Sequence, residues 1–313
     1  MSNIVTVLGA SGNVGKLLVP FLAAKGYQVR AVGRSLPKFK ESNVENLTID
    51  YESQDDLNKV SKDSSATYML IGLEYKTSVW QQQWPQLVER IIESAKVTKS
   101  KLVFFDNVYA YGLVAGPITE ETPMNPETKK GAVRKILDEL LLKAIAKTEI
   151  NAVIAKSADF YGPGITTSVI GDRFFDLILN KDTFEWFGNP EKKHNYTYVN
   201  DIPASLEALA TSDFTGNIHL PTGKSQTGLE FKMLVEKLTG KTLKLAPLRQ
   251  STAWWLGLFM PILKELHEMM YQSENDYDFS SAKFEKLFPE VKTTSYEHGF
   301  KETLEWYKAN LKK

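Results

Sequence analysis

The sequence of 313 residues lacks cysteine, has no net charge and contains only four histidines. The absence of cysteine excludes disulfides, thiolate catalysis and cysteine-ligated metal. The histidines follow no ligand spacing, so we expect no metal site; they are His194, His219, His267 and His298. Lys plus Arg and Asp plus Glu are both 38. This balance disfavours a nucleic acid or a membrane surface as partner, because both attract a basic excess.

Long hydrophobic runs are also missing. No apolar stretch approaches the length of a membrane span. The first apolar run, residues 4–8, is too short for the core of a secretion signal and lacks a preceding basic segment. We therefore expect a cytoplasmic protein whose partner is a small-molecule substrate.

Apolar runs alternate with amphipathic segments through the first half of the chain. This alternation predicts an α/β fold with a parallel sheet. The runs show no polar alternation, which indicates strands covered by helices on both faces. The predicted strands are residues 5–8, 28–32, 47–49, 68–71, 102–105 and 152–155. After residue 161, turn-rich pieces and short helices predict a second part that packs directly on the sheet.

A glycine-rich loop, residues 9–15, follows the first strand and opens a helix. Gly9 permits a tight turn, Gly12 lets the backbone approach a pyrophosphate, and Gly15 allows close contact between helix and strand. The helix N-terminus then faces the phosphates. The loop predicts that a nicotinamide dinucleotide binds here; the alternative is a tight turn without a ligand. The predicted cofactor residues in the loop are Gly9, Ser11, Gly12, Asn13, Val14 and Gly15.

The end of the second strand predicts which cofactor binds. No acid stands there to accept the ribose 2′-hydroxyl of NAD, and Arg34 is placed to pair with a 2′-phosphate. We expect NADP, with NAD as the alternative, unless Arg34 is simply a solvated loop cation. Asp50 follows the third strand and either meets the adenine edge or caps the helix beginning near Ser53. Tyr51 and Gly72 complete the predicted cofactor site.

Several motifs carry a family resemblance that covers nearly the whole chain. The Gly-x-x-Gly-x-x-Gly spacing resembles the short-chain dehydrogenase/reductase superfamily, and further stretches resemble its extended branch, the NAD-dependent epimerase/dehydratase family. These stretches are residues 104–112, 159–164, 196–201, 278–281 and 299–307. The resemblance implies a Rossmann, doubly wound NAD(P)-binding domain at residues 1–160, to which part of 195–225 returns. It also implies a smaller C-terminal α/β substrate domain, mainly residues 161–313, and a homodimer, although the sequence alone equally allows a monomer.

The catalytic residues depart from the pattern of the family. Its members use a Ser or Thr after the fifth strand and a Tyr-x-x-x-Lys pair on the next helix, whereas this chain has Asn107, Lys130 and Arg134 there. Asn107 can orient a carbonyl, Arg134 can hold the cofactor ribose, and a desolvated Lys130 beside Arg134 can act as acid or base. Alternatively, Tyr109 or Tyr111 supplies the phenol. A further alternative is that catalysis is absent.

The substrate region has few arginines. Relatives that act on sugar nucleotides place one just before the 196–201 motif, where this chain has His194, and no arginine follows residue 249. A nucleoside-diphosphate sugar is therefore disfavoured. Tyr161 is the predicted substrate contact at the cleft mouth, with Tyr111 and His194, a loop histidine, as further candidates.

These observations leave three functional hypotheses. The first is an NADP-dependent oxidoreductase or epimerase-type enzyme that acts on a small carbonyl or hydroxyl substrate. The second is a non-catalytic dinucleotide-binding sensor or scaffold. The third is a sugar-nucleotide epimerase with relocated catalytic residues.

Overall fold

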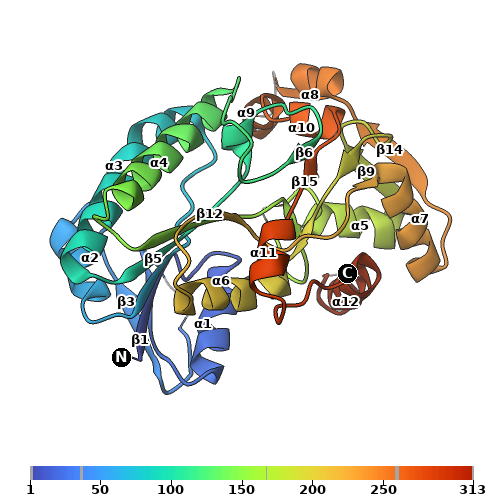
Figure 1. Ribbon diagram of the computed structural model, residues 1–313. Helices are drawn as coiled ribbons and strands as arrows, with labels where there is room; N and C mark the ends of the chain where they lie inside the picture. Colours follow the sequence, from blue (N-terminus) through green and yellow to red (C-terminus); the bar gives the residue numbers. More distant parts are fainter. Residues whose placement is uncertain (1–2, 36–37, 167, 258–260, 312–313) are drawn as a thin grey trace.

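The computed structural model describes residues 3–35, 38–166, 168–257 and 261–311 (Figure 1). Its centre is a seven-stranded sheet in the order β12-β7-β5-β4-β1-β2-β3, in which every neighbouring pair is parallel. The strands are β1 (Ile4–Leu8), β2 (Gln28–Gly33), β3 (Val44–Thr48), β4 (Ala66–Met69), β5 (Lys101–Asp106), β7 (Ala152–Lys156) and β12 (Gly216–His219). The predicted parallel sheet is confirmed.

Helices cover both faces of this sheet (Figure 1). α1 (Gly15–Ala24) and α6 (Ile202–Thr211) pack with the sheet in one apolar core, through side chains such as Leu18 and Leu206. α2 (Gln54–Ser61), α3 (Thr77–Thr98) and α4 (Lys129–Ala146) share a second core, which includes Trp84 and Leu137. Burial on both faces explains why the strands are apolar runs, and the doubly wound arrangement is confirmed.

The edge strand β3 begins earlier than the sequence predicts, at Val44 rather than at residue 47. It is an edge strand beside β2, and its Glu45 and Asn46 side chains are exposed. An exposed start has no apolar pattern, so the hydrophobic signal covers only the later residues.

The remainder of the chain forms further, mostly short elements. Many of them pack around a third core that is rich in aromatic rings and includes Tyr161, Phe175, Trp186, Phe231 and Phe300. The elements before residue 202 are η1 (Tyr109–Tyr111), β6 (Pro117–Ile118), β8 (Phe160–Tyr161), α5 (Asp172–Lys181), β9 (Thr183–Phe187), β10 (Lys193–His194), β11 (Thr197–Tyr198) and η2 (Val199–Asp201). The later ones are β13 (Gln226–Thr227), α7 (Gly228–Thr239), β14 (Lys244–Leu248), α8 (Gln250–Gly257), α9 (Pro261–His267), α10 (Tyr271–Glu274), β15 (Asp278–Phe279), α11 (Ala282–Leu287) and α12 (Tyr296–Asn310).

The strand β12 lies in the sheet although it follows β11 and α6, and it falls within the segment 195–225 that the sequence predicts to return there. The domain limits at residues 160 and 161 stay a prediction. Among the described residues, no helix combines the length and the apolar character needed to cross a membrane.

The strand order reverses between β1 and β4, with β2 and β3 on one side and β5, β7 and β12 on the other. In open parallel sheets, ligands bind beyond the carboxyl ends of the strands at such a reversal. The glycine loop that follows β1 and Gly72, which follows β4, lie at this point.

Candidate functional site

The glycine loop is a tightly packed turn. Gly9 has φ +85°, and its N–H donates to the carbonyl of Val32 and to the hydroxyl of Tyr51. A Cβ on Gly9 would lie 2.6 Å from the backbone of Leu70, and one on Gly15 would lie 2.6 Å from the Gly9 carbonyl oxygen. Only glycine fits both positions. The turn therefore brings the N-terminus of α1, the positive end of the helix dipole, to the switch point of the sheet.

The Tyr51 hydroxyl stabilises this turn through two hydrogen bonds to the backbone. It accepts from Gly9 N–H at 3.1 Å and donates to the Val32 carbonyl at 3.2 Å. Burial raises the pKa of Tyr51 to about 12, which keeps the phenol protonated. The hydroxyl is thus committed to the loop, so that only the Tyr51 ring remains for the predicted contact with a cofactor.

Arg34 lies just past the end of β2 with an exposed side chain. It comes two residues after Val32, whose carbonyl accepts the Gly9 and Ala10 N–H groups, so it lies close to the glycine loop. Among the described residues, no carboxylate forms an ion pair with Arg34. Four of the other arginines are in ion pairs, and the fifth, Arg90, donates to the Tyr51 carbonyl. An uncommitted guanidinium beside the ribose position is the arrangement that a 2′-phosphate requires.

Asp50 and Gly72 complete the predicted cofactor surface. Asp50 does not cap α2, because Ser53 accepts the Asp56 N–H there, so the capping alternative is wrong. The Asp50 carboxylate accepts the Glu52 N–H within its own exposed loop. Gly72 is exposed, and a Cβ there would meet nothing within 4 Å, which leaves open space beyond the end of β4.

Lys130 lies in the first turn of α4 and is fully buried. Its ammonium donates to Glu265 Oε2 at 2.6 Å, to Glu268 Oε1 at 2.7 Å, and to Thr77 Oγ1 and the Glu265 carbonyl, both at 2.9 Å. Three N–H bonds thus serve four acceptors. These acceptors leave no N–H of Lys130 for a substrate, which argues against the predicted acid/base role.

The two glutamates also bind the N-termini of two sheet-covering helices. Glu265, near the end of α9, accepts the Thr77 N–H at the start of α3, and Glu268 accepts the Lys129 N–H at the start of α4. These N–H groups have no intrahelical partner and favour negative charge. We call this set, Lys130 with Thr77, Glu265 and Glu268, the α9 latch. It fastens the C-terminal part of the chain over the start of α3 and α4.

Arg134, one turn further along α4, is buried beneath the loop that follows β5. Its guanidinium pairs with Asp106 Oδ1 at 3.0 Å and lies 4.5 Å from the Trp80 ring centre and 4.2 Å from that of Trp84. With only 7% of its side chain exposed, it is placed to position Asp106. This position favours a positioning role over the predicted contact with the cofactor ribose.

The same cluster contains two residues that the sequence interpretation missed, Lys156 and Asp138. Lys156, at the end of β7, donates to Asp106 Oδ2 at 2.9 Å, to Asp138 Oδ2 at 2.7 Å and to the Asn107 carbonyl at 3.3 Å. Two cations and two carboxylates are therefore buried together. One signal was available: Arg134 and Asp138 are four residues apart on one helix face, and a lysine ends an otherwise apolar strand.

The charges within this cluster have opposite effects on its two carboxyl groups. Burial alone would raise the pKa of Asp106, but the charges of Lys156 and Arg134 outweigh it and lower that pKa. Burial raises the pKa of Asp138, the charge of Lys156 lowers it, and the charge of Asp106 raises it. The net result is a pKa raised to about 7. Asp138 is thus a carboxyl that changes its protonation near neutral pH.

Asn107 and Tyr109 occupy the loop directly above that cluster. Asn107 Oδ1 accepts the Tyr109 N–H at 3.0 Å, which leaves the side-chain amide N–H groups as donors. The half-buried Tyr109 ring stacks on Trp80 at 6.3 Å, and burial raises the pKa of its phenol well above the ordinary value. Gly131 permits this approach of α4 to the loop, since a Cβ there would lie 2.7 Å from the Tyr109 carbonyl oxygen.

Tyr111 does not reach the same place. Its hydroxyl is bonded to His219 Nε2 at 2.7 Å and to Asn217 Nδ2 at 2.9 Å, and the residue is 1% exposed. His219 Nδ1 faces the Ser280 carbonyl, which only accepts, so Nδ1 carries the proton and Tyr111 donates to Nε2. The alternative that Tyr111 supplies the phenol is contradicted. Burial lowers the pKa of His219 to about 3, and this histidine is a core residue whose two ring nitrogens are both bonded.

Tyr161 is a correction to the prediction. It is fully buried, 4.6 Å from the ring centre of Phe300, and its hydroxyl would touch a Cβ placed on Gly299. It is therefore a core residue and not a substrate contact at a cleft mouth. The Gly-Pro-Gly sequence after it indicated an exposed turn, but β8 pairs with β11 and draws the tyrosine inward.

His194 is not a loop residue, because it lies in β10, paired with β13, and is 5% exposed. Its Nε2 lies 3.2 Å from Asp159 Oδ2, and its ring stacks on Tyr277 at 5.7 Å. Asp159, three residues beyond Lys156, keeps 37% of its side chain exposed. The side chain of Asp159, which the sequence does not single out, is thus partly exposed, whereas the predicted substrate contact His194 is buried.

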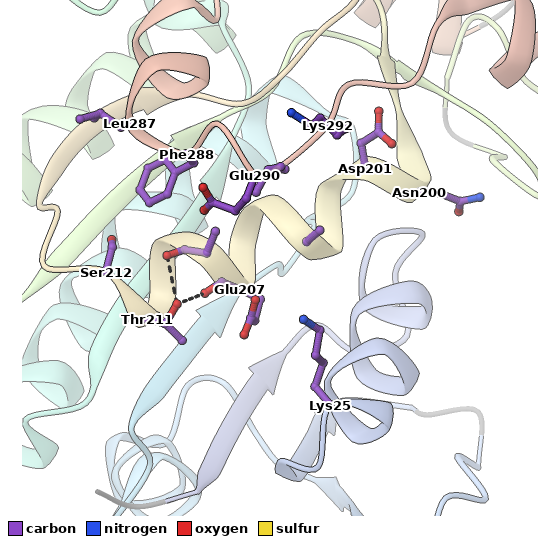
Figure 2. A pocket seen from close by; sticks show the side chains of 13 residues that line it. Lys25, Asn200, Asp201, Glu207, Thr211, Ser212, Leu287, Phe288, Glu290 and Lys292 are labelled. Atoms are coloured by element: carbon purple, nitrogen blue, oxygen red, sulfur yellow. Dashed lines mark hydrogen bonds between the residues drawn. The ribbon is translucent and has the colours of Figure 1, made fainter.

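Two hollows lie elsewhere. The larger, of about 650 Å³, runs along α6 between the end of α1 and the segment after α11 (Figure 2). Two of its carboxylates are already bonded: Asp201 accepts from Thr294, and Glu207 accepts from the Tyr27 hydroxyl. It includes Lys25, at the opposite end of α1 from the glycine loop, so it is not the cofactor site. A second, of about 440 Å³, is lined by residues that include Tyr111, Asn217 and Lys283.

Comparison with known proteins agrees with this geometry. The model of the NAD dependent epimerase/dehydratase family matches residues 5–217, and the chain belongs to this family. An uncharacterised protein of Sinorhizobium fredii is 24% identical over 97% of this chain and 78% of its own. The dTDP-glucose 4,6-dehydratase of Bacillus anthracis, solved with NAD, has a TM-score of 0.80 at 16% identity and covers 98% of this chain and 97% of its own. The UDP-glucuronic acid 4-epimerase of Bacillus cereus, also solved with NAD, has a TM-score of 0.78 at 18% identity, with 99% and 100% covered. The family resemblance in the sequence is confirmed.

Proposed function

We propose that this chain is an NADP-dependent oxidoreductase or epimerase-type enzyme that acts on a small carbonyl or hydroxyl substrate. The observation that carries the proposal is the glycine loop at the switch point, with the uncommitted Arg34 beside it. The tight turn fits a pyrophosphate, the open space at Gly72 fits the bound dinucleotide, and Arg34 fits a 2′-phosphate. The two structural relatives named above are solved with NAD, so the proposed preference for NADP rests on this chain's own residues alone.

The bound nicotinamide would supply hydride transfer, and the residues after β5 would position the substrate. Tyr109 keeps its proton, because burial raises its pKa, and it can donate a hydrogen bond to a substrate oxygen. Asn107 offers its free amide N–H groups to the same oxygen. Lys156, which donates to the Asn107 carbonyl, and Arg134, which forms an ion pair with Asp106, hold this loop in place.

A second candidate is a non-catalytic dinucleotide-binding protein. The observation that favours it is the complete engagement of Lys130, whose four acceptors leave no N–H free, at the position of the family's catalytic tyrosine. The third candidate, a sugar-nucleotide epimerase, is favoured by the activities of the structural relatives.

A titration with NADPH and with NADH tests the cofactor proposal. We expect NADPH to bind more tightly, and Arg34→Ala to weaken NADPH by about tenfold or more, since a charged hydrogen bond contributes roughly 1.5–3 kcal/mol. NADH affinity should stay within about twofold, because NADH lacks the phosphate that Arg34 would contact. The control is Arg173→Ala, whose guanidinium pairs with Glu185 on an exposed surface. An unchanged NADPH-to-NADH ratio in Arg34→Ala would contradict the proposal.

Turnover separates the enzyme from the non-catalytic candidate. We expect oxidation of NADPH in a screen of small carbonyl compounds and a large loss of that rate in Tyr109→Phe. Binding of NADPH should be retained in this variant, since the phenol is not assigned to the cofactor. Tight NADPH binding with no turnover for any carbonyl or alcohol would favour the sensor or scaffold.

A further inference from the structure

The second hollow, of about 440 Å³, lies beside β12, the edge strand of the seven-stranded sheet. Its walls come from segments that are far apart in the sequence, namely Tyr111 of η1, the stretch 120–124 after β6, residues 214–217 at the start of β12, and Lys283 of α11. The strands β7, β5 and β4 separate β12 from β1 and its glycine loop, so the hollow is distinct from the predicted cofactor site. Its volume lies in the range of small-molecule sites, roughly 300–1,000 Å³.

A hydrogen-bonded chain runs along the buried side of this hollow. Asn217 Nδ2 donates to the Tyr111 hydroxyl at 2.9 Å, and this hydroxyl donates to His219 Nε2 at 2.7 Å. His219 Nδ1 in turn donates to the Ser280 carbonyl, which can only accept. The directions of these bonds are therefore fixed, and Asn217 has to turn its amide nitrogen, rather than its amide oxygen, towards Tyr111.

Two acceptors in the lining are therefore left without a donor or a cation. Asn217 Oδ1 is buried and receives no hydrogen bond from the part of the chain that the structure describes. Glu120 Oε1 accepts the His219 backbone N–H at 3.0 Å, but no cation within the described ranges pairs with this carboxylate. Buried polar groups are almost always satisfied, so the unpaired amide oxygen indicates that water or a ligand supplies a donor. An ammonium, with three N–H donors, can serve both acceptors.

Lys283 adds a cation to the lining. Its ion pair with Glu121 is long, at 3.9 Å, and 75% of the Glu121 side chain is exposed. Surface pairs of this kind contribute little to stability, so a carboxylate in the hollow can compete with Glu121 for the ammonium. The ammonium also lies 5.5 Å from the ring centre of Phe214, which gives the hollow an apolar side together with Met124 and Leu142.

We propose that this hollow is a second ligand site, and that it binds an α-amino acid with an apolar side chain. The ammonium of the ligand donates to Asn217 Oδ1 and to Glu120, and its carboxylate accepts from Lys283. Its side chain packs against Phe214 and the other apolar residues of the lining. Binding here requires neither the cofactor nor the proposed reaction.

Isothermal titration of the full chain with L-leucine and three analogues tests this site. Leucinamide lacks the carboxylate, 4-methylpentanoate lacks the ammonium, and glycine lacks the side chain. We expect L-leucine to bind about tenfold more tightly than each analogue, because each analogue loses one of the three contacts.

Two variants assign these contacts to residues. Lys283→Met should weaken L-leucine by about fivefold or more and leave leucinamide within about twofold, because leucinamide has no carboxylate to lose. Glu120→Gln keeps an acceptor for the His219 N–H, and it should weaken L-leucine while leaving 4-methylpentanoate unchanged. Lys286→Met removes an exposed lysine of the same helix that does not line the hollow, so it is the matched control and should bind L-leucine as the wild type does.

No binding of L-leucine, or equal binding of L-leucine and the three analogues, would overturn the inference. An affinity for L-leucine that stays unchanged in Lys283→Met would overturn it as well, since the amino acid would then bind elsewhere on the protein. The side chain of Lys283 is 38% exposed, so this variant is expected to fold and decides the question even if Glu120→Gln does not fold.

Discussion

At the scale of single residues, Asp138 is the group whose protonation depends most directly on the buried cluster. Its pKa is raised by burial from an ordinary value of 3.8 to about 7. Between these values the folded protein binds a proton that the unfolded chain does not, so the stability contributed by Asp138 is full at low pH and falls as pH rises towards 7. The slope can reach about 1.4 kcal/mol per pH unit.

Asp138→Asn should therefore remove a decrease in the free energy of unfolding between about pH 5 and 7. The measurement is urea denaturation of both proteins at several pH values. Glu139→Gln, a neighbouring substitution on the exposed side of α4, is the control and should leave the decrease in place. A parallel pH dependence in wild type and Asp138→Asn would contradict the assignment.

Gly131 makes a second prediction at this scale. A Cβ there would meet the Tyr109 carbonyl oxygen and the Pro126 Cβ, both at 2.7 Å, so Gly131→Ala should push α4 away from the loop that follows β5. Overpacking of this kind costs about 1–3 kcal/mol, and we expect that loss in the free energy of unfolding. Gly72→Ala meets nothing within 4 Å and should leave stability unchanged, which makes it the matched control.

At the scale of elements, the α9 latch joins α9 to the starts of α3 and α4 through Lys130, Glu265 and Glu268. Lys130→Met would leave two carboxylates without their buried cation. Removing one partner of a buried ion pair costs about 3–5 kcal/mol. We expect this variant to be destabilised, and hydrogen exchange to accelerate first in α9 and at the N-terminus of α3.

The control for the latch is Lys135→Met on the same helix. Lys135 is 37% exposed and 3.9 Å from Glu139, and such surface pairs contribute about 0–1 kcal/mol. Equal effects of the two substitutions, or exchange that accelerates evenly through the protein, would show that the latch does not hold α9.

At the scale of the whole molecule, the expected homodimer stays a prediction. The outward positions of α3 are mostly polar, including Gln82 and Gln86, while α4 exposes Ile136 at 45%. A dimer contact formed by α3 and α4 would therefore be largely polar, which predicts a weak, concentration-dependent dimer. Light scattering across a dilution series should show it, and Ile136→Glu should shift it to monomer. A monomer at every concentration would exclude this interface.

The sequence by itself determined the sheet, the glycine loop and the family, because these depend on local signals. Short apolar runs that alternate with amphipathic segments indicate buried strands, and the turn at Gly9 has a positive φ, which glycine adopts readily. The position of Arg34 after β2 follows from the same register. The sequence also shows that Lys130 and Arg134 depart from the family pattern, but it does not reveal the roles of these two side chains.

Only the tertiary structure decided those roles, because each depends on a partner far away in the chain. Lys130 is neutralised by glutamates more than 130 residues away, and Tyr161 is drawn into a core by Phe300. Asp159 is exposed while His194 is buried behind it, a distinction that the sequence does not encode locally. The glycine loop is fixed by its own backbone, whereas the chemistry beside it is fixed by which distant side chains neutralise one another.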